Sequence, residues 1–427
     1  MTNSLLTIGD MVRGVELPDA DQQFWWDSLA PILSRMLQCS KYSVESQANI
    51  LSFFKDFIVP SYGPRPSIDG EFFWKSYVTY NHTPGQVSFN FHKDKCTVRL
   101  SNVPTAPLAG TASDPFNQKG VIQTIKQIQK ALPDMDMTLF DYFSEAFLVA
   151  DEDTVGLDAR KPVPQYNQLV VASMLGYDFE PVPRVKVYFN PRWKALQMNI
   201  ENHDLIWTAI NNLGSPIKSY KRTLDLLQEC GNPRQPGGWI FQPEFISFDL
   251  AENMSNTARL KLYGFTTKTC WSHIENIYTL DGRLNDAETQ RGLAVLKRLW
   301  HLALSIPEDH DENQDLPPCP HLTAGVIYNY ELRENSAKPE AKIYIPVRFY
   351  GSGDGKVIEG LVDFFKSEGW DELASSYQRD FVSVFSTPDG KMVGEHHDIS
   401  FSYKNDHPYV TAYYRPELIR PMERHIV

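Results

Sequence analysis

The stretch "ARLKLYGF", residues 258–265, places two cations and a phenol at alternate positions of one short segment. Arg259, Lys261 and Tyr263 are separated by leucines, and the side chains of a β-strand point alternately to opposite faces. The pattern therefore predicts a strand with a polar face of Arg, Lys and Tyr and an apolar face of leucines. On a surface strand the charges would face water, whereas in a strand that lines a cavity they would face a ligand.

The same alternation recurs along the chain at intervals of roughly 70 to 90 residues, which indicates a repeated supersecondary unit. The further segments are "CTVRLSNV" with Arg99, "RVKVYFNP" with Lys186 and Tyr188, "AKIYIPV" with Lys342 and Tyr344, and "PYVTAYY" with Tyr409, Thr411 and Tyr413. Because the polar face repeats in this way, we favour the cavity over the surface interpretation.

Apolar residues at helical spacing fill the intervals between these segments. They occur in "FWWDSLAPILSRML", "SQANILSFFKDFIV", "KGVIQTIKQIQKAL", "IKSYKRTLDLLQEC", "TQRGLAVLKRLWHLALSI" and "KVIEGLVDFFKSEGW". The unit is therefore a pair of helices and a pair of strands, repeated about five times in a single domain over residues 1–427. We expect an α/β (α+β) fold in which about ten antiparallel strands close around a solvent-filled lumen and helices cover the apolar outer face.

Composition narrows the classes of function. The formal net charge of −12 argues against a nucleic-acid binder, which needs a clustered basic surface. Five scattered cysteines without a CxxC pair suit a reducing compartment. The start "MTNSLLTIGDMVRG" has no secretory layout, and no apolar run approaches the ~18 residues of a membrane span. A soluble, cytoplasmic protein that binds neither nucleic acid nor membrane is expected.

Arginines and lysines that converge from several strands suit a di- or tri-anion, and a diphosphate is the obvious candidate. Tyrosine hydroxyls can donate to phosphate oxygens, and the faces of tyrosine rings attract cations. Such a lumen fits the ionisation of an allylic diphosphate: the basic groups stabilise the leaving diphosphate while the rings shield the allyl cation from water.

No metal site is predicted. Metal-dependent enzymes that use prenyl diphosphates hold magnesium through aspartate-rich helices, and the chain has no DDxxD motif. The acidic stretch "EDHDENQD" lies in a proline-flanked segment typical of a surface loop. His396, His397 and Asp398 in "EHHD" are weak candidate ligands, because adjacent histidines on a strand point in opposite directions.

The sequence resembles the fungal aromatic prenyltransferases of the dimethylallyltryptophan synthase type, which have the ABBA prenyltransferase barrel. The resemblance runs through "WWDSLAPILSRML", "PSYGPRP", "VSFN", "KVYFNP", "RLKLYG", "YNYELR", "KIYIPV", "ISFSY" and "PYVTAYY". It covers nearly the whole chain, and the motifs are specific in combination.

The resemblance assigns a role to each recurring residue. It implies that the prenyl diphosphate is bound by Arg99, Lys186, Arg259, Lys261 and Lys342, with Tyr409 as a further contact. It implies that the allyl cation is shielded by Tyr188, Tyr263, Tyr344 and Tyr413. It also implies that no cofactor is required, Mg²⁺ or Ca²⁺ being able to enhance the reaction without being essential, and a monomer or homodimer that takes dimethylallyl diphosphate and an aromatic small molecule.

Departures from the family pattern bear on the aromatic acceptor. Gln86 in "GQVSFN" stands where indole-prenylating members have a glutamate that accepts the indole N–H, and we expect it to position the acceptor without polarising it. Leu175 or Gly176 stands near the place of a lysine proposed as the base in tryptophan C4-prenylating members. Asn190 and Asp398 occupy positions where relatives often carry further tyrosines. Free tryptophan is therefore not the expected acceptor.

Two kinds of acceptor stay open: an elaborated indole, such as a cyclic dipeptide or indole alkaloid, and a phenolic or polyketide aromatic. We favour the elaborated indole because it is the commoner acceptor in the family. The expected reaction is a metal-independent electrophilic aromatic substitution in secondary metabolism, with the base unassigned. The rivals are a non-catalytic barrel that binds an apolar anion and a metal-dependent isoprenyl enzyme.

Overall fold

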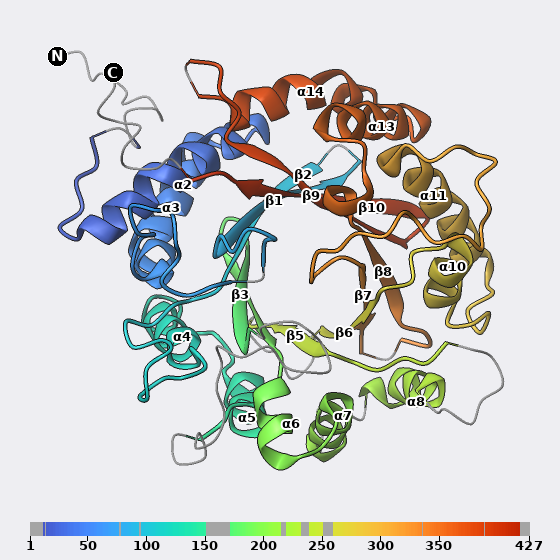
Figure 1. The fold of residues 1–427 in the computed structure, drawn as a ribbon, viewed down its shortest axis with the longest axis horizontal. Helices are drawn as coiled ribbons and strands as arrows, with labels where there is room; N and C mark the ends of the chain where they lie inside the picture. The colour runs from blue at the N-terminus through green and yellow to red at the C-terminus, as the bar shows by residue number, and fades with distance from the viewer. Residues whose placement is uncertain are drawn as a thin grey trace.

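The computed structural model describes residues 12, 14–76, 78–93, 95–150, 171–214, 219–231, 239–250, 259–334, 336–387 and 389–418. Its centre is a closed barrel of ten antiparallel strands in the order β1-β10-β9-β8-β7-β6-β5-β4-β3-β2 (Figure 1). The strands are β1 (Gly85–His92), β2 (Lys95–Asn102), β3 (Ser173–Asp178), β4 (Arg184–Phe189), β5 (Phe245–Asp249), β6 (Leu260–Thr266), β7 (Val326–Leu332), β8 (Glu340–Ile345), β9 (Gly394–Lys404) and β10 (His407–Pro416). The predicted fold class is confirmed.

Helices ring the barrel in chain order (Figure 1). They are α2 (Ala20–Cys39), α3 (Val44–Phe53), α4 (Lys119–Ala131), α5 (Thr138–Phe147), α6 (Arg192–Met198), α7 (Asn202–Asn212), α8 (Lys221–Cys230), α10 (Trp271–Thr279), α11 (Ala287–Leu304), α12 (Val347–Tyr350), α13 (Asp354–Ser367) and α14 (Asp371–Phe385), with short π- and 3₁₀-helical turns η1 (Phe54–Ile58) and η2 (Val59–Tyr62) after α3. The repeat is looser than a strict helix pair, because in the described ranges three helices precede each of the hairpins β5–β6 and β9–β10. Among the described helices, none is long and apolar enough to cross a membrane.

The two faces of the strands follow the alternation read from the sequence. Val187, Phe189 and Leu262 are fully buried in the apolar core between sheet and helices. Lys186 and Lys261, at the alternate positions, are also buried but lie on the opposite face, where they meet the carboxylates of neighbouring strands. The prediction that the polar face lines the lumen is therefore confirmed.

The strands also have a common polarity. Each odd-numbered strand pairs with the even-numbered strand that follows it, so all five hairpins turn at one end of the barrel. We call this end the hairpin rim and the opposite end, where the helical connections join, the mouth. Every even-numbered strand runs from the hairpin rim to the mouth. On such a strand, a residue with a higher number therefore lies nearer the mouth.

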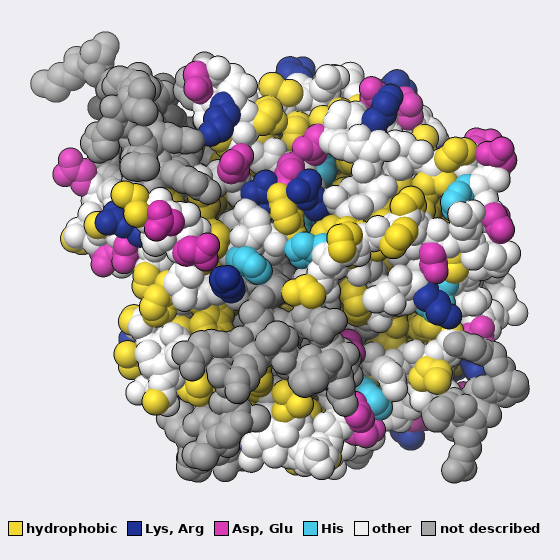
Figure 2. Space-filling model, viewed as in Figure 1, with side chains coloured by type: hydrophobic (Ala, Val, Ile, Leu, Met, Phe, Trp, Pro, Cys, Tyr) yellow, Lys and Arg dark blue, Asp and Glu magenta, His cyan; other side chains and the backbone are white. Residues whose placement is uncertain are grey.

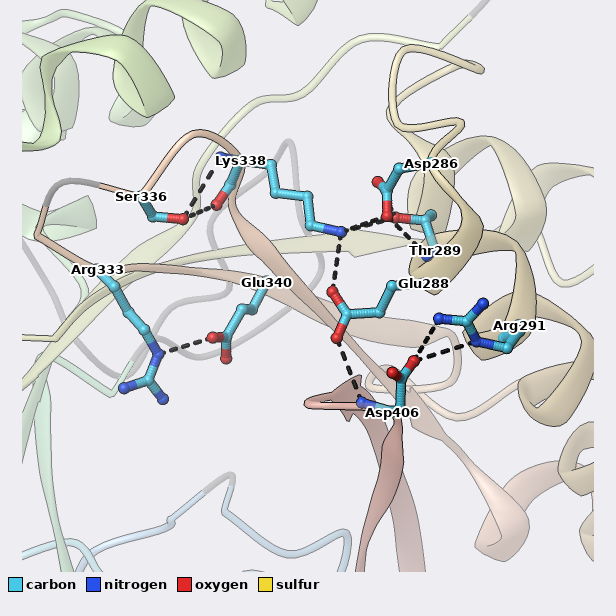
Figure 3. Close-up of polar contacts among 9 residues, drawn as sticks. All are labelled: Asp286, Glu288, Thr289, Arg291, Arg333, Ser336, Lys338, Glu340 and Asp406. Carbon is cyan, nitrogen blue, oxygen red and sulfur yellow. Dashed lines mark hydrogen bonds and ion pairs between the residues drawn. The ribbon is translucent and has the colours of Figure 1, made fainter.

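A polar network fastens the hairpin rim to the start of α11 (Figure 3). Lys338, before β8, lies 2.7 Å from Asp286 Oδ1 and 3.2 Å from Glu288 Oε2. Asp406, between β9 and β10, accepts from Arg291 Nε at 3.1 Å. Exposed pairs of this kind contribute little individually, about 0–1 kcal/mol. Together they fix the positions of two hairpins relative to one helix.

Candidate active site

Strand polarity separates the lumen into two layers. In β4, β6 and β8 the lysine comes two residues before the tyrosine: Lys186 before Tyr188, Lys261 before Tyr263, and Lys342 before Tyr344. Because each of these strands starts at the hairpin rim, the lysines form a cation layer nearer that rim and the tyrosines form a layer nearer the mouth. The recurring Lys-x-Tyr spacing is thus the origin of the layering.

One half of the cation layer is centred on Asp178, the last residue of β3. Its Oδ1 lies 2.9 Å from Arg99 Nε, and its Oδ2 lies 2.6 Å from Lys186 Nζ. Burial alone would raise the pKa of Asp178, but Arg99 and Lys186 outweigh burial and hold the pKa below its ordinary value. Burial lowers the pKa of Lys186 to about 7, although the charge of Asp178 opposes the shift.

The other half contains Arg259 and Lys261 with two carboxylates. Arg259 Nε donates to Asp249 Oδ2 at 2.7 Å, and Lys261 Nζ lies 3.6 Å from Glu331 Oε2. Burial opposes ionisation of both acids, but the neighbouring cations lower the pKa of Asp249 and Glu331. Three carboxylates therefore accompany the five predicted cations, and full protonation of all five would leave two positive charges for an anionic ligand to balance.

Lys342 is the cation of this layer that no carboxylate accompanies among the described residues. Burial lowers its pKa well below the ordinary value, and the charges of Arg99 and Lys261 add to the effect. A buried ammonium without a counter-ion is unfavourable. An incoming diphosphate would supply the missing negative charge, so Lys342 is suited to bind the ligand with uptake of a proton.

The four predicted shield tyrosines form a continuous layer. Ring centroids are 5.9 Å apart for Tyr188 and Tyr263, 6.4 Å for Tyr263 and Tyr344, and 5.7 Å for Tyr344 and Tyr413. Burial raises the pKa of Tyr188, Tyr344 and Tyr413, so their phenols stay neutral. Neutral, adjacent rings can stabilise a carbocation through their faces while they exclude water.

The remaining predicted residues lie on either side of these layers. Gln86, buried near the mouth end of β1, comes two residues before Ser88, which is paired with Tyr413. Tyr409 lies near the hairpin rim, where its ring stacks on His92 at 4.1 Å and lies 4.7 Å from Lys404 Nζ. Gln86 is therefore placed for an acceptor at the mouth, and Tyr409 for the diphosphate end; both roles stay predictions.

The sequence analysis missed the carboxylates of the lumen and one further cation. Asp178, Asp249 and Glu331 lie in phase with lumen residues of their own strands, and so does Lys404 of β9. The signal was the same alternation, in "MLGYD", "FISFD", "YNYEL" and "ISFSYK". These acids are the counter-ions that allow so many cations to be buried together.

Within the described part of the chain no group of three or more His, Cys, Asp and Glu side chains is arranged to hold a metal ion. The two histidines of "EHHD" differ in environment as expected: His396 contacts Tyr377 and Phe381 among the helices, whereas His397 bonds to Asp398.

Known proteins are similar to the chain along most of its length. Residues 21–380 match the family model described as tryptophan dimethylallyltransferase. The chain is 97% identical to the indole diterpene prenyltransferase ptmD of Penicillium ochrochloron over 427 residues, 100% of both chains. It is 35% identical to the indole diterpene prenyltransferase nodD2 of Hypoxylon pulicicidum, over 96% of this chain and 94% of that protein.

Solved structures share the barrel. The NotF structure in complex with brevianamide F and DMSPP superposes with a TM-score of 0.80 at 26% identity, covering 97% of this chain and 99% of that one. AnaPT of Neosartorya fischeri superposes with a TM-score of 0.79 at 23% identity, covering 96% and 98%, and shows the fold alone. By its sequence and its barrel, the chain belongs to the tryptophan dimethylallyltransferase family of prenyltransferases.

Proposed function

We propose that the protein transfers a dimethylallyl group from dimethylallyl diphosphate to an indole diterpene, without a metal, in fungal secondary metabolism. The observation that carries the proposal is the order of layers in the lumen: paired and unpaired cations near the hairpin rim, then four tyrosines, then Gln86 near the mouth. This order matches the three parts of the reaction, which are leaving group, carbocation and acceptor.

The residues divide the work of an electrophilic aromatic substitution. The cation layer binds the diphosphate as the allylic C–O bond breaks, and Lys342 supplies charge that no protein carboxylate has neutralised. The tyrosine layer covers the allyl cation. An aromatic carbon at the mouth then attacks the cation, a C–C bond forms, and loss of the ring proton restores aromaticity. Orientation and preorganised charge supply most of the rate, since the acceptor ring is already electron-rich.

Two observations support an indole diterpene over a phenolic acceptor. Relatives named as indole diterpene prenyltransferases are 97% and 35% identical to this chain over nearly its whole length. Gln86 offers a neutral acceptor for an indole N–H, which suffices when the ring needs orientation rather than activation. Both observations agree with the expectation that the acceptor is an elaborated indole and not free tryptophan.

The test is product detection by mass spectrometry with purified protein, dimethylallyl diphosphate and EDTA. The acceptors would be an indole diterpene, a tryptophan-containing cyclic dipeptide, tryptophan and a fused phenol. We expect prenylation of the indole diterpene at a kcat/KM at least about tenfold above the others, a difference of about 1.4 kcal/mol.

Each of the other outcomes would favour a different function. Preference for the phenol would favour the polyketide alternative. Binding of diphosphate without turnover of any acceptor would favour the non-catalytic barrel. Turnover that requires magnesium would overturn the assignment of the cation layer as the sole diphosphate site.

A further inference from the structure

The mouth of the barrel holds a histidine–aspartate pair outside both layers. His397 Nδ1 lies 2.6 Å from Asp398 Oδ2, and Asp398 is the cross-strand partner of Tyr413. Residues directly opposite each other in an antiparallel sheet share a face. Asp398 therefore lies on the lumen face, next to the tyrosine layer.

A bulge in β9 brings the histidine to the same side. Tyr413 pairs with Asp398 but Tyr414 pairs with His396, so His397 is the extra residue between them. Such a residue can be re-aimed relative to the regular alternation. The ring of His397 lies 6.3 Å from the rings of Tyr80 and Phe349, away from the helix-packed face that His396 occupies.

The second ring nitrogen of His397 is unused. Its side chain is 10% exposed, and Nε2 is closed to solvent without a hydrogen-bond partner among the described residues. With Asp398 accepting the proton on Nδ1, Nε2 carries a lone pair. A buried acceptor without a donor is unfavourable, and a proton released by a bound substrate would supply the missing partner.

Other groups of the mouth are already engaged. Glu395 Oε1 accepts from Tyr80 at 2.7 Å and from Arg415 Nε at 2.9 Å, and Arg348 lies 3.3 Å from Glu395 Oε2. The two guanidinium groups also lie 4.0 and 5.0 Å from the Tyr80 ring. Figure 2 shows basic and histidine side chains gathered near the middle of the face above the barrel. This cluster holds Tyr80 beside His397 and leaves Glu395 without a free role as a base.

We propose that His397 Nε2 is the base that removes the ring proton after prenyl transfer, and that Asp398 is the positioning residue that fixes the tautomer. The inference rests on the proposed aromatic prenylation. In the step, the C–H bond of the arenium ion breaks, its electron pair restores the aromatic ring, and the proton forms an N–H bond at Nε2. The imidazolium is stabilised by Asp398 and returns the proton to water or to product diphosphate.

The placement suits a flat aromatic acceptor. Gln86 and His397 come from β1 and β9, which lie on either side of β10. Neighbouring strands are about 4.8 Å apart, so the two residues approach the mouth from positions about 10 Å apart across β10. An indole between them could donate its N–H to Gln86 at one end and present a ring carbon to His397 at the other.

The test compares His397→Gln, Asp398→Asn and the matched control His310→Gln, a histidine of an exposed segment. Each variant is assayed with the best acceptor of the panel above, either unlabelled or deuterated at the prenylated carbon, and folding is checked by circular dichroism. In the unaltered protein we expect no isotope effect, since proton loss is fast. In His397→Gln we expect kcat to fall about 10²–10³-fold and a primary isotope effect of about 2 or more to appear.

Asp398→Asn should show the same isotope effect with a smaller fall in kcat, about tenfold, and His310→Gln should match the unaltered protein. A folded His397→Gln variant with unchanged kcat, or with a lower kcat and no isotope effect, would overturn the inference and leave the proposed prenylation intact. If His397→Gln does not fold, the isotope effect of Asp398→Asn decides. Failure of the unaltered protein to prenylate any acceptor would instead reject both proposals.

Discussion

Lys342 is partly buried and forms no ion pair with a carboxylate among the described residues, a combination that is usually unfavourable. Replacing it by methionine removes the buried amine and keeps most of the packing. We expect Lys342→Met to raise the thermal midpoint of the ligand-free protein by about 2 °C and to lower kcat/KM for dimethylallyl diphosphate about 10²–10³-fold. Calorimetry and steady-state kinetics would check this, and a fall in both quantities would contradict it.

Gln86 is the residue that separates acceptor binding from diphosphate binding. It lies beyond the tyrosine layer on β1, away from the cations. We expect Gln86→Ala to raise KM for the aromatic acceptor about tenfold, the loss of one hydrogen bond of about 1.4 kcal/mol, while KM for dimethylallyl diphosphate stays within twofold. Equal changes in both KM values would show that Gln86 supports the structure of the barrel and does not bind the acceptor specifically.

At the level of single residues, the sequence predicted which side chains face the lumen but not how they pair. Alternation around Lys186, Lys261 and Lys342 was enough to orient three strands. It did not identify Asp178 and Glu331, because an acid at alternate positions to a cation is equally typical of an ion pair on a solvent-exposed strand. The placing of His397 and Asp398 on one side could not be predicted, since one inserted residue in β9 interrupts the alternation of faces and leaves no mark in the composition.

The helices α11 and α13 approach closely at Gly360. A Cβ atom added to Gly360 would overlap the backbone carbonyl of Leu302 and lie 2.6 Å from its carbon. A side chain can relieve such an overlap by changing its rotamer, whereas the backbone of a packed helix cannot. Gly360→Ala should therefore lower the free energy of unfolding by about 3 kcal/mol, measured by urea denaturation.

The matched control is in the same helix. Gly355, in the first turn of α13, has nothing within 4 Å of an added Cβ. Gly355→Ala should leave stability unchanged or raise it by up to about 1 kcal/mol through helix propensity. Similar losses from both substitutions would mean that the α11–α13 contact is not the cause.

Among the elements, some amphipathic helices were predicted and others, including α14 with 15 residues, were not. The patterns of "KGVIQTIKQIQKAL" and "KVIEGLVDFFKSEGW" correspond to α4 and α13. The helices α5, α7 and α14 were missed, although α5 carries Leu139, Phe140, Phe143 and Phe147 at helical spacing, so the signal was present in the sequence. The extent of the domain over residues 1–427 stays a prediction, because it includes stretches outside the described residues.

For the whole molecule, the cation layer makes stability depend on pH. Burial lowers the pKa of Lys186 to about 7 and that of Lys342 well below its ordinary value, so between about pH 7 and 10 the unfolded chain binds more protons at these positions. Stability then rises with pH, by up to about 1.4 kcal/mol per pH unit for each lysine. Thermal midpoints at pH 7, 8 and 9 should increase, and the slope should shrink in Lys342→Met.

In the acidic range stability should also rise with pH, because here the carboxylates govern it. The pKa values of Asp178, Asp249 and Glu331 are lowered by their cations, so their contribution is present above about pH 4 and is lost as pH falls through the folded pKa values. Inorganic diphosphate should stabilise the protein more at pH 7 than at pH 9, because its binding favours protonated lysines. Equal stabilisation at both pH values would contradict proton-linked binding.

The pairing of β1 with β10 closes the barrel, and it joins Phe89 to Ala412 across most of the chain. During synthesis on the ribosome, the nine preceding strands can assemble only as an open sheet with two unsatisfied edges, and such edges are templates for aggregation. The barrel can therefore close, by pairing of β1 with β10, only after β10 has left the exit tunnel. A ribosome that stalls within the last hairpin would release a nearly complete chain that holds the five cations and the first three tyrosines but lacks Tyr413 and cannot exclude water from the lumen.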